Sequence, residues 1–211
     1  MASFRDKPSL HGASVLLRPV VAGDADDMWA DLQDPEGLKM TGTHARFTRD
    51  EIRGWCASRA ECSDRLDLAI VDAATGTWAG EIVLHEWDPH NRSCGFRIAV
   101  AAEARGRGVG TEATRLLVDF AFTEIDHPPV HRIGLEVYAF NHRAIGVYER
   151  VGFRREGVLR DALHWDGEFH DAIVMSMLRT DHAPTASATT TEARPSRSGG
   201  ARQGAWPVRG R

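Results

Sequence analysis

The chain has 211 residues, of which 42% are hydrophobic and 27% are charged, a balance typical of a globular domain. Its formal net charge of −4 argues against a general nucleic-acid-binding protein, and no apolar run is long enough for a membrane-spanning helix. The three cysteines, Cys56, Cys62 and Cys94, have neither metal-ligand nor disulfide-framework spacing, so we expect a cytoplasmic protein without a bound metal.

The first half of the chain predicts several strands and two helices. Apolar patterns indicate strands over residues 15–20, 66–71, 78–84 and 94–100. One helix is expected over 24–32, with Asp24 as its cap. A second helix is expected to begin at Thr48, because Glu51 follows three residues later in a capping-box pattern.

The second half alternates helices and strands. Amphipathic periodicity predicts helices over 111–124 and 141–151, and Gly152 suits the end of the second. Strands are expected over residues 132–137, 153–159 and 172–178. The fold class predicted from this order is α/β (α+β), with a mixed, mostly antiparallel sheet of about seven strands and helices on both faces.

The end of the chain differs in composition from the rest. Residues 181–211 are rich in Ala, Thr, Ser, Gly, Pro and Arg and nearly free of large apolar side chains. Such a segment buries too little surface to offset the entropy of ordering it. We therefore predict one domain over 1–180 and a disordered tail over 181–211.

The most informative segment lies between a predicted strand and the helix over 111–124. It reads Arg105, Gly106, Arg107, Gly108, Val109, Gly110 and Thr111. Glycines let neighbouring N–H groups point inward together, and the following helix adds the positive end of its dipole, which predicts a phosphate or pyrophosphate site. A Gly-rich turn with only a structural role is the alternative. The absence of Lys argues against the P-loop of an NTPase, and the glycine spacing argues against a dinucleotide fingerprint.

Two motifs carry a resemblance to a known family. The pattern Arg105-x-x-Gly108-x-Gly110 resembles the pyrophosphate-binding signature of the GNAT superfamily of acyl-CoA N-acyltransferases. Residues 141–153 resemble the superfamily's N-x-x-A-x-x-x-Y-x-x-x-G-F motif at every defined position. The resemblance covers roughly residues 13–179 and extends to the branch containing ribosomal-protein N-terminal alanine acetyltransferases and spermidine acetyltransferases.

The resemblance implies acetyl-CoA as co-substrate, laid between two splayed parallel strands, here 94–100 and 132–137. Backbone groups of the first strand would pair with the pantetheine arm, and amides of the glycine-rich loop would hold the pyrophosphate. Asn141 would bond the pantetheine or a nearby water, with a simple helix cap as its other interpretation. The implied cofactor-binding residues are Ile98, Ala99, Val100, Arg105, Gly106, Arg107, Gly108, Val109, Gly110, Thr111, Asn141 and Ala144.

The resemblance also implies catalytic roles. Tyr148 would protonate the leaving CoA thiolate, since a phenol has a pKa of about 10, and core packing is the alternative. Many relatives carry a Glu early in the strand before the loop, where this chain has Gly95. The candidates for the base are therefore Glu81, His85 or Glu86, or water alone, while a solvent-facing strand residue is the other interpretation of Glu81.

The expected activity is acetyl transfer to a primary amine by direct attack in a ternary complex, without a metal. The acceptor would be a small-molecule amine, an antibiotic or a protein N-terminus, and the acidic domain favours a cation. Nucleic acid and membrane are not expected as partners. Many relatives pair as a homodimer, and the sequence leaves the oligomeric state open. A non-catalytic acyl-CoA sensor or scaffold is the alternative that Gly95 favours. Candidate acceptor-pocket residues are the aromatic Trp29, Trp55, Trp87, Trp165 and Phe169 and the acidic Asp88, Asp161 and Asp166. Core packing is the alternative for each aromatic residue, and a solvated, charged loop face is the preferred interpretation of each acidic one.

Overall fold

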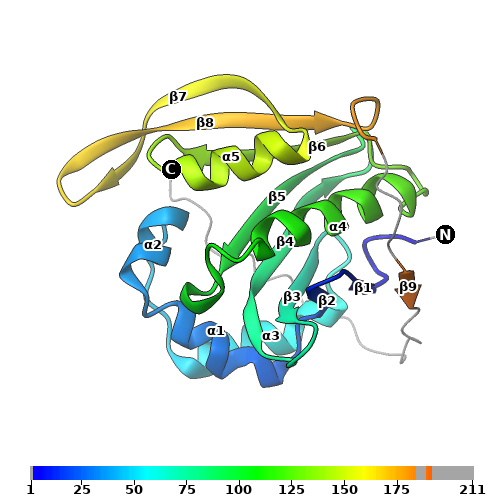
Figure 1. Cartoon of the computed structure of the whole chain (residues 1–211), viewed down its shortest axis with the longest axis horizontal. Coiled ribbons are helices and arrows are strands. Elements are labelled where there is room, and N and C mark those ends of the chain that lie inside the picture. The colour runs from blue at the N-terminus through cyan, green and yellow to red at the C-terminus, as the bar shows by residue number, and fades with distance from the viewer. Residues whose placement is uncertain (1, 184–188, 192–211) are drawn as a thin grey trace.

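The computed structural model describes residues 2–183 and 189–191, and over these residues one sheet crosses the molecule (Figure 1). Its strands lie in the order β7-β8-β6-β5-β4-β3-β2-β1-β9. They are β1 (Ser9–His11), β2 (Val15–Pro19), β3 (Leu66–Asp72), β4 (Trp78–Asp88), β5 (Ser93–Val100), β6 (Arg132–Tyr138), β7 (Arg154–Trp165), β8 (Glu168–Leu178) and β9 (Thr189–Thr191). Neighbours are antiparallel except β5 and β6, which confirms the predicted mixed, mostly antiparallel fold.

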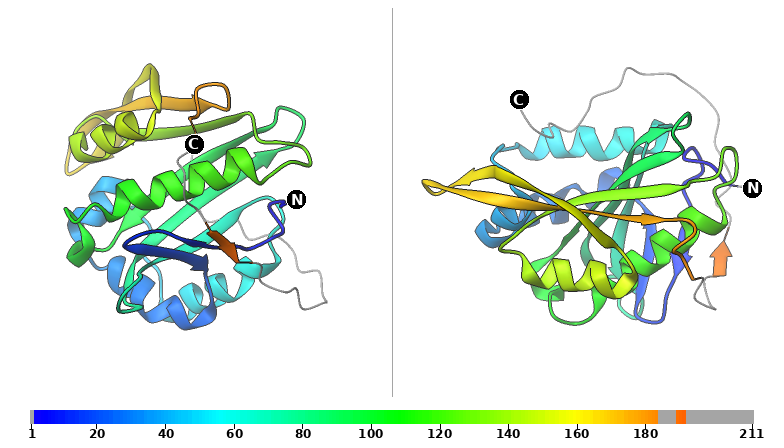
Figure 2. Two further views of the ribbon diagram at one scale, coloured as in Figure 1. Left: turned by 45° about the vertical axis from the view of Figure 1, so that its right-hand side comes forward. Right: turned by 90° about the horizontal axis from the view of Figure 1, so that it is seen from above.

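Helices cover both faces of the sheet, as predicted. They are α1 (Ala25–Asp31), α2 (Pro35–Thr41), α3 (Arg49–Ser58), α4 (Val109–Thr123) and α5 (His142–Val151). Figure 2 shows α4 and α5 on one side of the strands and α3 on the other. The sheet therefore separates two layers of helices.

Strand alternation builds a core on each face of β3. Leu68 and Ile70 belong to the cluster that includes the buried residues of α4, while Ala69 between them packs with Met28 and Ile52 from α1 and α3. Successive strand residues point to opposite faces, so one strand serves both layers. Burying each large side chain contributes about 1.5 to 3 kcal/mol.

The helix ends follow the sequence signals with one exception. Thr48 and Glu51 form the predicted capping box, in which Glu51 Oε2 accepts a hydrogen bond from the Thr48 N–H at 2.8 Å. Gly152 ends α5 with a φ of 117°, in the left-handed region that favours glycine. Asp24, however, makes no side-chain cap to α1, because its carboxylate is engaged by Arg18 at 2.6 Å and by the N–H of Val21.

Several elements differ from the predicted ones. The short helix α2 was not expected, although Asp34 caps it and accepts from the N–H of Gly37 at 3.0 Å. The closing strands are longer than expected and form one hairpin, whose turn places Asp166 and Gly167 at φ values of 50° and 85°. The β7 residues are mostly exposed, so the strand lacks the apolar alternation on which strand prediction depends. The three-residue strands β1 and β9 are too short to show a period.

The predicted tail lies mostly outside the described residues. The structure gives no description of 184–188 and 192–211, and the disorder predicted for 181–211 stays a prediction, as does the domain boundary at 180. Thr189–Thr191 pairs antiparallel with β1. None of the helices in the described ranges is long and apolar enough to cross a membrane.

An ion pair ties β7 to the centre of the sheet and predicts a pH-dependent stability. Arg132 on β6 donates to both carboxylate oxygens of Glu156, and the hydroxyl of Ser176 on β8 donates to Oε1 at 2.7 Å. The Arg132 guanidinium is the main cause that lowers the pKa of Glu156 to about 2. The stabilisation is therefore present above the ordinary Glu pKa and is lost as the pH falls toward about 2.

We expect Glu156→Gln to lower the free energy of unfolding, with the difference from wild type largest above about pH 5 and vanishing near about pH 2. Denaturant titrations across that range measure it. Glu168→Gln, at an exposed position of the same hairpin, serves as the control. A difference that stays constant with pH would contradict this assignment.

Candidate active site

A large cleft opens where the two parallel strands separate. β5 and β6 pair only from Ser93 to Gly95 on one strand and from Arg132 to Gly134 on the other. Beyond these residues the strands diverge, which confirms the predicted splay. A cleft of about 1850 Å³ begins there and is lined by parts of α1, α2, β4, β5, β6, the loop before α4, α5, β7 and β8.

One wall of the cleft is a strand edge without a strand partner. Ile98, Ala99 and Val100 line the cleft, as predicted for residues that face the pantetheine arm. On their other side they pair with β4, for example Val100 with Gly80. Within the described residues, no pairing between β5 and β6 continues past Gly95. An extended chain with amide groups could therefore add to this edge as another strand does.

The glycine-rich loop forms one end of the cleft. Gly106 and Gly108 have φ values of 79° and 87°, a left-handed conformation that favours glycine. Gly108 directly precedes α4, whose first N–H groups have no carbonyl partner one turn earlier. The predicted loop residues that line the cleft are Arg105, Gly106, Gly108, Gly110 and Thr111.

Two predicted loop residues do not line the cleft with their side chains. The Val109 side chain is buried in the main core cluster. The Arg107 side chain is 61% exposed and reaches Asp72 at 3.3 Å. Any contact of these two residues with a ligand would come from their backbone N–H groups, the role that the family resemblance implies for the amides of residues 105–111.

The positive charge of Arg105 is paired with carboxylates rather than free at the loop. Its guanidinium contacts Asp34 at 2.5 Å and Glu36 at 3.2 Å, and it also donates to the carbonyl of Val100. The two carboxylates belong to the start of α2 and neutralise the charge. Arg105 thereby fixes α2 against the loop, across 71 positions of sequence from Asp34.

The first turn of α5 supplies a cation that the sequence analysis missed. Arg143 lines the cleft, and its Nη2 lies 3.7 Å from where a Cβ on Gly106 would stand. Its neighbours Asn141 and Ala144 also line the cleft, and the Asn141 carboxamide accepts from the Ala144 N–H at 3.1 Å. Asn141 is thus a helix cap at the cleft, so its two interpretations are compatible. The signal for Arg143 was its place inside the second motif.

Tyr148 reaches the cleft from α5. Its ring meets Phe96 and Phe153 edge-on, each at 5.9 Å between centroids. The residue is buried yet lines the cleft, and burial raises the pKa of its phenol well above the usual value. The phenol therefore keeps its proton at neutral pH and is a hydrogen-bond donor.

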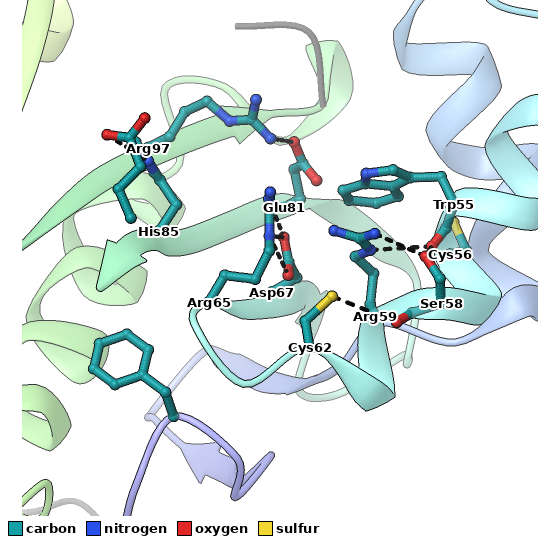
Figure 3. A network of polar contacts seen from close by, with 12 residues as sticks. Trp55, Cys56, Ser58, Arg59, Cys62, Arg65, Asp67, Glu81, His85 and Arg97 are labelled. Carbon is teal, nitrogen blue, oxygen red and sulfur yellow. Dashed lines mark hydrogen bonds and ion pairs between the residues drawn. The ribbon is translucent and has the colours of Figure 1, made fainter. Parts of the chain in front are cut away.

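The candidate bases line the cleft on the face of the sheet opposite Phe96. Glu81 is held by Arg97 at 2.6 Å, as Figure 3 shows, and its side chain is only 13% exposed. The interpretation of Glu81 as a solvent-facing strand residue is therefore wrong. Its second oxygen, Oε2, is buried and has no hydrogen-bond partner in the described part of the chain. His85 and Glu86 line the same cleft.

The candidate aromatic residues do not line the cleft within the described ranges, whereas Trp78 and Phe47 do. Trp87 stacks on Phe4 at 4.7 Å, and the Phe169 side chain is exposed. The remaining three pack against other side chains, namely Trp29 against Arg49, Trp55 against Arg59 and Trp165 against His44.

The predicted acidic loop residues also lie elsewhere. Asp88 accepts from the N–H groups of His90 and Asn91 in the β4–β5 turn, and like Asp161 and Asp166 it does not line the cleft. The carboxylates that line it are Asp31, Glu36, Glu81, Glu86 and Glu136. Among residues 2–183 and 189–191, no group of three or more His, Cys, Asp or Glu side chains could hold a metal ion.

Comparisons with known proteins agree with this geometry. A family model for the acetyltransferase (GNAT) domain matches residues 14–154. The chain is 34% identical over 106 residues to YdaF of Bacillus subtilis (strain 168), provisionally named a ribosomal N-acetyltransferase. It is 29% identical over 116 residues to the spermidine N(1)-acetyltransferase of Escherichia coli (strain K12). These matches cover 50% and 55% of this chain and 56% and 61% of the two relatives.

A solved structure shares the fold. The spermidine N-acetyltransferase from Vibrio cholerae in complex with CoA and spermine superposes with a TM-score of 0.74 at 23% identity. The superposition covers 81% of this chain and 98% of that one. The predicted family resemblance is confirmed.

Proposed function

Because the chain belongs to the acetyltransferase (GNAT) domain family, we propose that it transfers an acetyl group from acetyl-CoA to a primary amine. The observation that carries this proposal is the cleft that begins where β5 and β6 separate. Its glycine loop and unpaired β5 edge suit a CoA chain, and its other lining includes several carboxylates that suit an amine. Both substrates can therefore be present at once, as direct attack in a ternary complex requires.

Residues of β5, the glycine loop and α5 would each bind a different part of acetyl-CoA. The amides of Ile98–Val100 would pair with the pantetheine arm. The N–H groups of residues 105–111 would hold the diphosphate, assisted by the charge of Arg143. Asn141 would contact the pantetheine while it caps α5, and Ala144 would leave room beside it.

An acyl-cysteine route is disfavoured by the placement of the thiols. Cys94 lies in β5 but does not line the cleft, and burial raises its pKa to about 12. Burial likewise raises the pKa of the Cys56 thiol to about 12, under α1 and α3. The nucleophile in such a route is a thiolate, so the amine itself is the better nucleophile here.

A cationic acceptor suits the face of the cleft near Glu81. The buried, unpartnered Oε2 of Glu81 can accept a hydrogen bond from an ammonium group. Asp31 also lines this region and accepts from the Trp78 indole at 2.7 Å. The V. cholerae neighbour is described in complex with spermine, which supports an amine of this kind. Cytoplasmic location remains a prediction.

The activity test follows free thiol during incubation with acetyl-CoA and a panel of amines. The panel contains spermidine, kanamycin and a short peptide with an N-terminal alanine. We expect thiol release that depends on one of these acceptors, with the acetylated product confirmed by mass. Tight acetyl-CoA binding without acceptor-dependent release would instead support a non-catalytic sensor or scaffold.

We expect Arg143→Ala to weaken acetyl-CoA binding by at least about 10-fold, because a hydrogen bond to a charged group contributes about 1.5 to 3 kcal/mol. Isothermal calorimetry measures the change. Arg53→Ala is the control, since Arg53 is an exposed residue of α3 that pairs with Asp50 outside the cleft. Equal affinities for the two variants would remove Arg143 from the binding site.

A further inference from the structure

The imidazole of His85 fills the space that a side chain at position 95 would take. The register of β4 and β5 places His85 directly opposite Gly95. A Cβ built on Gly95 would lie 2.5 Å from Cε1, 2.8 Å from Nε2 and 2.9 Å from Nδ1 of the imidazole. These separations are too short for real atoms, so the ring lies against the backbone of β5. Glycine at 95 is what allows this position.

The His85 ring lies at the point where β5 and β6 separate, here called the fork of the sheet. Gly95 is the last β5 residue that pairs with β6, opposite Gly134, so the ring lies where the strands begin to diverge. The next residue, Phe96, points to the other face and meets the ring of Tyr148 there. His85 and Tyr148 therefore approach the fork from opposite faces of the sheet, and both line the cleft.

The groups around His85 keep its imidazole neutral at neutral pH. Glu86 on the same strand has Oε2 3.5 Å from Nδ1 and favours the charged form, as does Asp67 on β3. Arg97 on β5 and Arg65 beside β3 oppose it. Burial is the largest influence, and the net effect lowers the pKa of His85 below its ordinary value. With Nδ1 toward Glu86, Nε2 is the nitrogen left for proton transfer.

We infer that His85 is the general base that takes a proton from the acceptor's ammonium group, an inference that rests on the proposed acetyl transfer. Glu81 lies four residues earlier on the same face of β4 (Figure 3), about 13 Å away by strand geometry. Its carboxylate is already engaged by Arg97 on one oxygen. The free oxygen of Glu81 can therefore bind a second ammonium group of the acceptor, while His85 removes the proton from the ammonium group that attacks.

Deprotonation by His85 precedes attack on the thioester. Nε2 of His85 takes one proton from the ammonium group, which leaves a neutral amine and an imidazolium. The amine lone pair forms the new C–N bond at the thioester carbonyl carbon. Collapse of the tetrahedral intermediate breaks the C–S bond, and the CoA thiolate receives a proton from Tyr148. The amide nitrogen loses its extra proton to restore the phenol, and the imidazolium releases its proton to water.

The test is a double-mutant cycle between His85 and Gly95, with the fastest acceptor of the amine panel. We expect His85→Ala and His85→Gln to lower kcat/KM by about 100-fold at neutral pH, with acetyl-CoA affinity unchanged. Gly95→Ala displaces the ring and should cause a similar loss in wild type but little further loss in His85→Ala. His90→Ala, an exposed histidine in the β4–β5 turn, is the matched control.

The pH profile gives a second readout. In wild type, kcat/KM should fall as the pH drops through the His85 pKa, below its ordinary value. In His85→Ala this inflection is lost, and kcat/KM instead rises with pH continuously up to the pKa of the amine itself. An unchanged pH profile, or losses that add in the double variant, would overturn the assignment. Absence of turnover in wild type would instead refute the proposed function, and thermal melts exclude unfolded variants.

Discussion

Replacing Tyr148 with phenylalanine is expected to lower kcat by about 100-fold while leaving acetyl-CoA affinity within about twofold of wild type. The phenol lies at the cleft, and its raised pKa keeps it protonated until a thiolate leaves. Phenylalanine retains the edge contacts with Phe96 and Phe153, so it removes the donor without removing the ring. The substitution therefore separates catalysis from core packing, the other interpretation of this residue.

The measurement compares single-turnover rates with calorimetric affinities for acetyl-CoA. Because burial moves the pKa of Tyr148 upward, its ionisation should produce no loss of rate in wild type below about pH 10. An unchanged rate in Tyr148→Phe would mean that the thiolate leaves without a proton from this residue. A loss of affinity that matches the loss of rate would indicate a packing role.

Local signals made part of the site predictable. The glycine loop and the Asn141–Phe153 motif are each short, continuous segments of the sequence, and their backbone conformations follow from residue type. Glycines at positive φ occur where the loop turns into α4, and the Asn141 side chain caps α5. Such features depend on neighbours in sequence, so they can be read without the fold.

Contacts between distant segments could not be predicted in the same way. The charge of Arg105 is neutralised by Asp34, which belongs to a helix that the sequence analysis did not find. The position of His85 depends on the register between β4 and β5, which no local pattern specifies. Residue type alone could not separate pocket aromatics from core aromatics, and the fold places the five candidate side chains outside the cleft.

Replacing Gly108 with valine is expected to raise the dissociation constant for acetyl-CoA by more than about 10-fold. Gly108 has a φ of 87°, which costs a residue with a Cβ about 1 to 2 kcal/mol. If the loop changes its backbone conformation to relieve this strain, the N–H groups that precede α4 no longer converge on the diphosphate. If the loop keeps its positive φ at position 108, the branched valine side chain lies beside these N–H groups and obstructs the diphosphate.

Gly76 provides a matched control for that substitution. It has a φ of 71° in the turn between β3 and β4, and a Cβ there would meet nothing within 4 Å, as at Gly108. Gly76→Val should therefore lower the free energy of unfolding by a similar amount without changing acetyl-CoA affinity, because Gly76 does not line the cleft. Denaturant titration and calorimetry on both variants separate the two effects. Equal affinities would mean that the backbone at the start of α4 does not bind the coenzyme, since the cost in stability alone would then account for both variants.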